Sequence, residues 1–246
     1  MGPFAAVAVG ASDPSGERGL ALDLRTFQAL GVAGRPVVAA VGAGDAEGAG
    51  PAYQLPAATV AAQLQRALRG LRNPAVKASI LETVPLLRLV GRLLREAGSD
   101  VVVDSGPECG PGLAGLRSAA AATALAEFLP VAALVLVRPE EAQRLCGLPV
   151  RTEAEAKAAA RRIQALGPRA VLVRWEPSPP GTGEAAGLLD GHTWRCLAHG
   201  TPGGGPAAPF SLGAAVTAWV ARGETLPDAV DRAFRFLCEE AGRKGT

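Results

Sequence analysis

The sequence predicts an α/β fold in which helices cover both faces of a central, mostly parallel β-sheet. Two observations carry this prediction. Apolar runs of strand length alternate with helical patterns along most of the 246 residues. The runs are apolar throughout, which is typical of parallel strands that are buried on both faces. No linker divides the chain, so we expect a single domain over residues 1–246.

The expected elements follow one another in a regular β–α order. The first apolar run, Phe4 to Val9, predicts a strand, and the residues after it place apolar side chains at spacings of three and four, which predicts a helix. Thr152 and Glu155 form the signature of a capping box at the start of a later helix. The expected strands are 4–9, 36–42, 100–104, 132–137, 169–174, 185–189 and 192–197, and the expected helices are 19–30, 57–70, 83–97, 113–128, 139–146, 152–166, 211–222 and 226–242.

Segments that directly follow strands are the candidate binding positions, because ligands of such sheets bind beyond the carboxyl ends of the strands. Two of these segments, residues 174–184 and 200–209, are rich in glycine and proline, and each is either a lid over the site or a flexible loop. Ser211, at the start of the helix expected over 211–222, is of a residue type that caps helix N-termini.

Residues 11–27 are the most informative of these segments. A strand, a turn of small residues and a helix leave a pocket of backbone N–H groups at the helix N-terminus, which suits an anion or a polar small ligand. Asp13, Ser15 and Asp23 are the polar residues near its mouth. An ordinary β–α turn built on the Pro-Ser-Gly bend explains the same pattern, and spacing alone does not separate the two interpretations.

Composition and charge argue against several classes of protein. A formal net charge of +2 predicts no basic surface for nucleic acid. No stretch approaches the ~20 apolar residues that span a bilayer, and the N-terminus lacks the features of a signal peptide. The four cysteines lie far apart and the chain has two histidines, so we expect a cytoplasmic location and no bound metal.

The segment 11–27 also carries a family resemblance. It resembles the opening of the hydroxymethylpyrimidine and phosphomethylpyrimidine kinases of thiamine biosynthesis, in the ribokinase superfamily. The matching residues are Ser12, Asp13, Ser15, Gly16, Gly19, Asp23, Leu24, Arg25, Thr26 and Phe27. The resemblance continues through Lys77, through Val101 to Asp104 and through Leu212 to Ala215, so it covers nearly the whole chain. It implies a ribokinase-like fold and a homodimer.

The resemblance also implies two sets of site residues. The substrate, a pyrimidine-like small molecule, would be bound by Asp13, Asp23, Gly44 and Asp45. The nucleotide would be bound by Glu141, Arg174, Gly203 and Gly204. Gly44 stands where the family has the Gln that reads the pyrimidine, and a glycine cannot make that contact. ATP and Mg²⁺ are implied if the chain is an active kinase.

Several family positions that carry chemistry are altered in this chain. The family's Gly-Thr-Gly-Cys-Thr loop, whose backbone forms the anion hole and whose Cys is the proposed base, falls on residues 207–211. Phe210 then occupies the base position and cannot accept a proton, and Pro209 removes a backbone donor. Trp175 replaces a small residue of the family, and we expect it to intrude on the space of the nucleotide.

These changes predict a kinase homologue that has lost phosphotransfer, has no catalytic residue, and binds a ligand, regulates or associates with a partner protein. The alternative is an active ATP-dependent kinase that phosphorylates hydroxymethylpyrimidine, its phosphate or a related small alcohol. A cleft filled by Phe210 and Trp175 would favour the first hypothesis, and an open cleft would favour the second.

Overall fold

The structure, a computed structural model, describes residues 4–43, 52–79, 81, 83–105, 119–176, 184–201 and 210–244. Its strands form a single nine-stranded sheet in the order β3-β2-β1-β4-β5-β6-β7-β8-β9. The strands are β1 (Ala5–Ser12), β2 (Ala33–Gly42), β3 (Ala52–Gln54), β4 (Ala75–Ser79), β5 (Asp100–Asp104), β6 (Ala132–Val137), β7 (Ala170–Trp175), β8 (Glu184–Asp190) and β9 (Thr193–Thr201).

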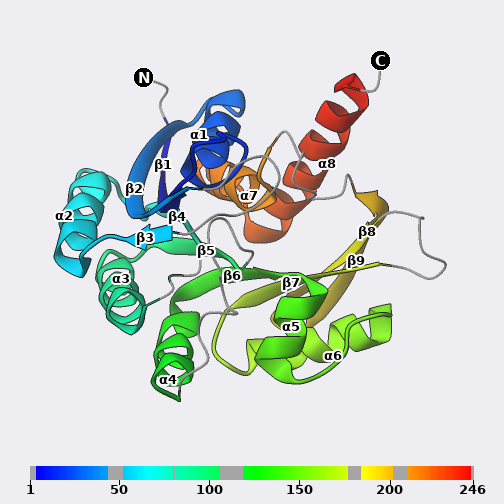
Figure 1. Cartoon of the computed structure of the whole chain (residues 1–246). Helices are drawn as coiled ribbons and strands as arrows, with labels where there is room; N and C mark the ends of the chain where they lie inside the picture. Colours follow the sequence, from blue (N-terminus) through cyan, green and yellow to red (C-terminus); the bar gives the residue numbers. More distant parts are fainter. Residues whose placement is uncertain are drawn as a thin grey trace.

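Helices cover both faces of this sheet (Figure 1). One face carries α1 (Gly19–Ala29), α7 (Leu212–Ala221) and α8 (Leu226–Lys244). The other face carries α2 (Ala57–Leu68), α3 (Val84–Glu96), α4 (Ala119–Phe128), α5 (Pro139–Cys146) and α6 (Glu153–Gln164), and a 3₁₀ turn, Leu129–Val131, follows α4. The predicted fold class is therefore confirmed. In the described part of the chain, no helix is long and apolar enough to cross a membrane.

Six neighbouring strands, β2-β1-β4-β5-β6-β7, run parallel, and three pairs at the two edges are antiparallel. The sequence analysis missed β3 and β4. β3 has only three residues, and Lys77 interrupts the apolar pattern of β4 at its centre. The first six residues of the helix expected over 113–128 lie outside the described residues.

Alternate side chains of the strands face the two core layers. On β1, Val7 and Val9 face the layer under α2 and α3, whereas Ala6 and Ala8 face the layer under α1 and α7. In this second layer Asp23 of α1 pairs with Lys77 of β4, which begins the site described below.

The chain changes direction across the sheet between β1 and β4. From β1 it moves to β2 at one side, and from β4 it moves through β5, β6 and β7 at the other. Such a switch point leaves a crevice at the carboxyl ends of the two neighbouring strands, where ligands of α/β sheets bind. Asp13 follows β1 at this edge, Ser79 ends β4 and Asp104 ends β5. The start of α7 lies over the same edge, next to Asp104.

Candidate functional site

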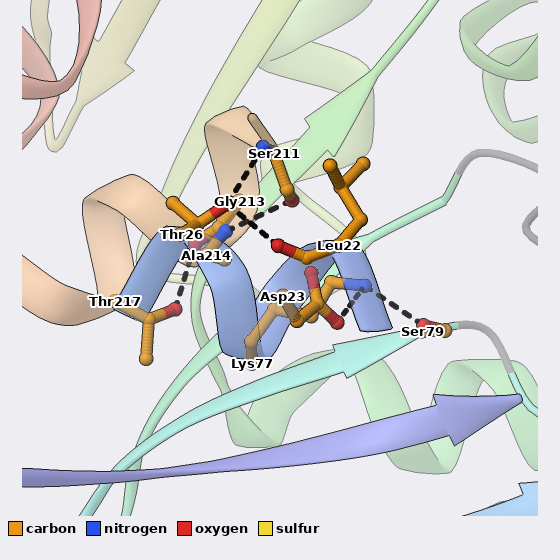
Figure 2. A network of polar contacts seen from close by, with 9 residues as sticks. All are labelled: Leu22, Asp23, Thr26, Lys77, Ser79, Ser211, Gly213, Ala214 and Thr217. Carbon is orange, nitrogen blue, oxygen red and sulfur yellow. Dashed lines mark hydrogen bonds and ion pairs between the residues drawn. The ribbon is translucent and has the colours of Figure 1, made fainter. Parts of the chain in front are cut away.

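A buried network of polar side chains joins α1, β4 and the start of α7 (Figure 2). Lys77 Nζ lies 3.0 Å from Asp23 Oδ2, and both side chains are 1% exposed. The same ammonium donates a hydrogen bond of 3.0 Å to Ser79 Oγ. Asp23 is on α1, and Lys77 and Ser79 project from alternate positions of β4, so the ion pair ties the helix to the sheet at its carboxyl edge.

Burial dominates the electrostatics of Asp23. Removal from water raises the pKa of Asp23 above its ordinary value. The charge and hydrogen bond of Lys77, and the Ser211 side chain, lower this pKa, whereas the negative charge of Asp104 raises it further. Asp23 therefore has Lys77, Ser211 and Asp104 as its electrostatic neighbours. These three residues come from β4, the start of α7 and the end of β5. The charge state of Asp23 therefore depends on three elements that meet at the carboxyl edge of the sheet.

Ser211 is the N-cap of α7, as the sequence predicts. Its hydroxyl accepts a hydrogen bond of 3.2 Å from the backbone N–H of Ala214. Its own backbone N–H donates to Thr26 Oγ1 at 3.0 Å, and the Thr26 hydroxyl donates in turn to the Leu22 carbonyl at 2.8 Å. Thr26 is fully buried. The start of α7 is thus held by α1 through one hydrogen bond between residues that lie 185 positions apart in the chain.

Gly213, in the first turn of α7, lies very close to the strand ends. A Cβ at this position would be 3.1 Å from Asp104 Oδ2 and 3.6 Å from Lys77 Cε. The Asp104 carboxylate and the Lys77 side chain therefore both lie directly beside the first turn of the helix. A helix N-terminus carries exposed N–H groups and a partial positive charge, which suits a phosphate group.

The turn after β1 is built by local hydrogen bonds. Asp13 accepts hydrogen bonds from the Ser15 backbone N–H at 3.0 Å and from the Ser15 hydroxyl, and Ser15 Oγ accepts from the Glu17 N–H at 3.1 Å. Asp13 is 5% exposed. Gly19 begins α1 with φ +57°, and a Cβ there would be 2.3 Å from the Ala11 carbonyl oxygen. The bend is an ordinary Asx turn at the carboxyl end of β1, as the second interpretation expects, and binding of an anion or polar ligand there stays a prediction.

The predicted nucleotide residues are spread over different environments. Glu141 is 7% exposed and accepts hydrogen bonds from Ser105 Oγ at 2.9 Å and from the Arg138 N–H at 2.9 Å, so it caps α5 and holds the end of β5. Arg174 is half-buried on β7, opposite Ala186 of β8. Gly44 and Asp45 of the substrate set, and Gly203 and Gly204 of the nucleotide set, lie outside the described residues.

The two aromatic residues that the sequence analysis singled out pack against other aromatic side chains. Trp175 is 2% exposed and stacks on Trp194 at 6.3 Å between ring centroids, within the core layer under α5 and α6. Phe210 packs against Phe236 of α8 at 4.9 Å between ring centroids. Trp175 is therefore a core residue and not an obstacle at the crevice. The contact of Phe210 is with α8, and Pro209, its neighbour, lies outside the described residues.

The described residues hold no group of three or more His, Cys, Asp or Glu side chains that could bind a metal ion by itself. Magnesium in phosphoryl transfer needs fewer protein ligands, because nucleotide phosphates and water supply the others. Asp104 is half-buried at the end of β5 and next to the first turn of α7, so its carboxylate fits such a role.

Sequence reasoning missed Lys77 and Thr26 as members of the site. Both belong to matching segments of the resemblance, but the chemistry of neither is visible from its own neighbourhood. Two features of the sequence were the available signal. A lysine lies at the centre of an apolar run, and Asp23 is the one carboxylate inside the helix expected over 19–30. A lysine rarely lies fully buried without a partner of opposite charge, so the combination favours an ion pair.

A mostly parallel α/β sheet, a crevice at its switch point and a late helix whose start meets that crevice define the class of ribokinase-like proteins, as the solved structures also show. The ADP complex of Bacillus subtilis pyridoxal kinase superposes with a TM-score of 0.81 at 28% identity, over 95% of this chain and 90% of that one.

Sequence comparison then gives the family. The phosphomethylpyrimidine kinase model matches residues 13–244, and the chain belongs to this family. The hydroxymethylpyrimidine/phosphomethylpyrimidine kinase of Streptomyces coelicolor is 31% identical over 245 residues, which are 96% of this chain and 87% of the relative. The enzyme of the same name from Rhizobium meliloti is 32% identical over 243 residues, 94% of this chain and 88% of the relative.

Proposed function

We propose that this protein is an active ATP-dependent kinase that transfers the γ-phosphoryl group of ATP to a small nitrogen heteroaromatic compound. The acceptor is the hydroxymethyl oxygen of hydroxymethylpyrimidine or, when its phosphate is the substrate, that phosphate group. The names of the relatives support the substrate class. The similar pyridoxal kinase acts on another compound of the same chemical kind. Phosphotransfer requires donors around the moving phosphoryl group and a cation to neutralise its charge.

The observation that carries this proposal is the polar network around the start of α7. Ser211 caps the helix, Thr26 holds the cap and Asp104 lies beside the first turn. A buried ion pair lies directly below. A protein that had abandoned phosphotransfer would have no use for buried charges at this position, where apolar side chains would pack as well.

Mg²⁺ would enter with the nucleotide and would be held by its phosphates and by Asp104. When bound, the cation neutralises charge that develops on the phosphate oxygens. The N–H groups at the start of α7 would contact the transferred phosphoryl group. The Asp13 turn and the Asp23 segment would form the wall next to the substrate.

The direct test is ADP release by the purified protein with ATP, Mg²⁺ and hydroxymethylpyrimidine or its phosphate. Asp104→Asn should lower kcat/KM at least tenfold, because it removes a charge next to the reacting phosphate. Asp100→Asn is the matched control. It lies at the other end of the same strand, where its carboxylate pairs with Arg169 at 3.6 Å, and it should leave kcat/KM within about twofold. Absence of turnover by the parent protein with every such substrate would refute the proposal.

Phe210 favours one second candidate, a protein that binds nucleotide and heteroaromatic compound without transfer. This candidate predicts that ATP at ~100 times its Kd stabilises the fold by ~2.7 kcal/mol while no ADP forms. Replacing Phe210 by Cys, the residue of the family at the base position, would then create measurable turnover, and Phe210→Leu would not. For an active kinase, the parent protein already turns over and the Cys variant is not required for activity.

A further inference from the structure

We infer that the Lys77–Asp23 ion pair is a positioning device that fixes the first turn of α7 relative to the sheet. The catalytic consequence of this inference rests on the proposed kinase activity, and the structural consequence does not. Lys77 and Asp23 are both 1% exposed and 3.0 Å apart, and they belong to β4 and α1. Neither residue is part of the phosphate-contacting surface argued above, so each acts through its neighbours.

The first step of the argument is that stability alone does not explain a buried pair. Two charges lose their hydration when they are buried, and replacing such a pair by apolar side chains of similar volume is often neutral or stabilising. The pair at Lys77 is nonetheless removed from water, since both side chains are 1% exposed. What a charge pair supplies and an apolar contact does not is direction, because the carboxylate must lie where its donors are.

The second step is how the pair reaches α7. Lys77 approaches Asp23 from the strand, so the pair fixes α1 on β4. Ser211, the N-cap of α7, is an electrostatic neighbour of Asp23, and its hydroxyl accepts from the Ala214 N–H. The pair and the cap of α7 therefore belong to one buried polar network (Figure 2).

The third step is the second attachment, which makes the position unique. One turn of α1 after Asp23, Thr26 accepts the Ser211 backbone N–H at 3.0 Å. Ser211 is thus held by its backbone N–H to α1, the helix that the ion pair fixes on β4. The Lys77 side chain also lies under Gly213, where a Cβ would be 3.6 Å from Lys77 Cε. Rotation or sliding of α7 would break at least one of these contacts.

The consequence for phosphotransfer follows from geometry. Groups that hold a reacting phosphoryl group must be placed to within a fraction of an ångström, and a misplacement of about 1 Å costs on the order of 100-fold in rate. Loss of the pair should therefore lower kcat about 100-fold. It should leave the KM for ATP within about threefold, because the pair touches neither the base nor the sugar of the nucleotide.

The experiment uses the double variant Lys77→Met/Asp23→Leu in the full-length protein. Single replacement of Lys77 leaves a buried carboxylate without its cation and is expected to fold poorly, whereas the double variant removes both charges together. The matched control is Arg88→Met/Glu127→Leu. This pair also joins two elements, α3 and α4, at 2.8 Å, but its side chains are about half exposed and the pair packs outside the network around α7.

Two readouts are taken on both variants. The first is kcat and KM with ATP, Mg²⁺ and the heteroaromatic alcohol. The second is amide hydrogen exchange of Ser211 and Ala214, with the Glu155 N–H as an internal reference, because it is held by the Thr152 cap of α6 in the same way at 3.2 Å. We expect at least tenfold faster exchange at Ser211 and Ala214 in the Lys77/Asp23 variant, with no change at Glu155 and no change in the control variant.

The outcomes separate the inference from the proposed function. If the parent protein is active, a folded Lys77/Asp23 variant with kcat within twofold of the parent overturns the inference. If the parent protein is inactive with every substrate, the proposed function fails and the exchange experiment decides the inference by itself. Unchanged exchange at Ser211 and Ala214 then overturns it, and selective acceleration there supports it.

Discussion

Gly19 gives the most sharply defined prediction, because its replacement meets two separate obstacles. Its φ of +57° lies in the left-handed region, and a Cβ would be 2.3 Å from the Ala11 carbonyl oxygen. Gly16, three residues earlier, has φ +71° and nothing within 4 Å of its Cβ position. The variants Gly19→Ala and Gly16→Ala thus share the backbone conformation and differ in the steric contact.

The magnitudes follow from this difference. A left-handed conformation costs a non-glycine residue about 1–2 kcal/mol, and both variants carry this cost. Gly19→Ala adds a backbone overlap that α1 or the end of β1 must relieve by moving, which costs about 1–3 kcal/mol by analogy with overpacked cores. We expect Gly16→Ala to destabilise by about 1–2 kcal/mol and Gly19→Ala by about 2–5 kcal/mol.

Urea unfolding of both variants, followed by circular dichroism, measures the two differences. For a chain of 246 residues, each kcal/mol corresponds to a shift in Tm of about 2–4 °C, so thermal unfolding gives an independent reading. A Gly19→Ala variant as stable as Gly16→Ala would refute the steric argument. It would show that the Ala11 carbonyl and the start of α1 separate freely, and that the turn does not fix where α1 begins.

Three further predictions concern buried polar contacts. Thr26→Val should destabilise by about 1–3 kcal/mol, because it leaves the Ser211 N–H without its acceptor, whereas Thr26→Ser should recover most of this loss in urea unfolding. Gln63→Leu should destabilise the fold by about 2 kcal/mol, because the Gln63 amide bonds both the N–H and the carbonyl of Val38 at 3.0 Å. Gln164→Leu is the comparison, and it should destabilise less because the Gln164 side chain makes one bond among the described residues, to the Arg169 carbonyl. Burial raises the pKa of Asp23 in the folded state. The contribution of Asp23 to stability is therefore complete below the ordinary pKa of 3.8, and it is lost as the pH rises through the raised pKa. Lys77→Met removes the cation that limits this rise, so its destabilisation relative to the parent should grow with increasing pH, and a constant difference from pH 4 to pH 8 would contradict the pairing.

The position of Phe210 changes how the altered loop is interpreted. From the sequence, an aromatic side chain at the family's base position predicts a filled and inactive cleft. In the structure, Phe210 forms an aromatic contact with Phe236 of α8, and its occupation of the base position stays a prediction. The phenylalanine at the family's cysteine position thus takes part in the packing between the start of α7 and α8. The polar network under α7 is present beside it. Loss of the cysteine remains the reason to test Phe210→Cys.

Trp175 illustrates a different limit of sequence reasoning. Its position at the end of a strand is visible from the sequence, but the face of the sheet on which its side chain lies is not. In the fold it packs on Trp194, whose indole N–H donates to Glu153 at 2.9 Å. The residue thus attaches the β8–β9 hairpin to the sheet instead of facing the crevice. A shift of one position along a strand reverses the face, so loose alignment in this segment could not decide it.

The sequence by itself determined the fold class, most of the element order and the family. These properties depend on local signals that add up along the chain, such as apolar runs, caps like Thr152, and the turn from Asp13 to Gly19. The tertiary structure alone decided that Lys77, Asp23 and Ser211 meet, and that Thr26 holds the cap of α7. These contacts join residues far apart in the chain, and they form only when α1 and α7 pack on the same face of the sheet. Local sequence patterns do not predict contacts between residues far apart in the chain, because burial and charge pairing arise only when the layers pack.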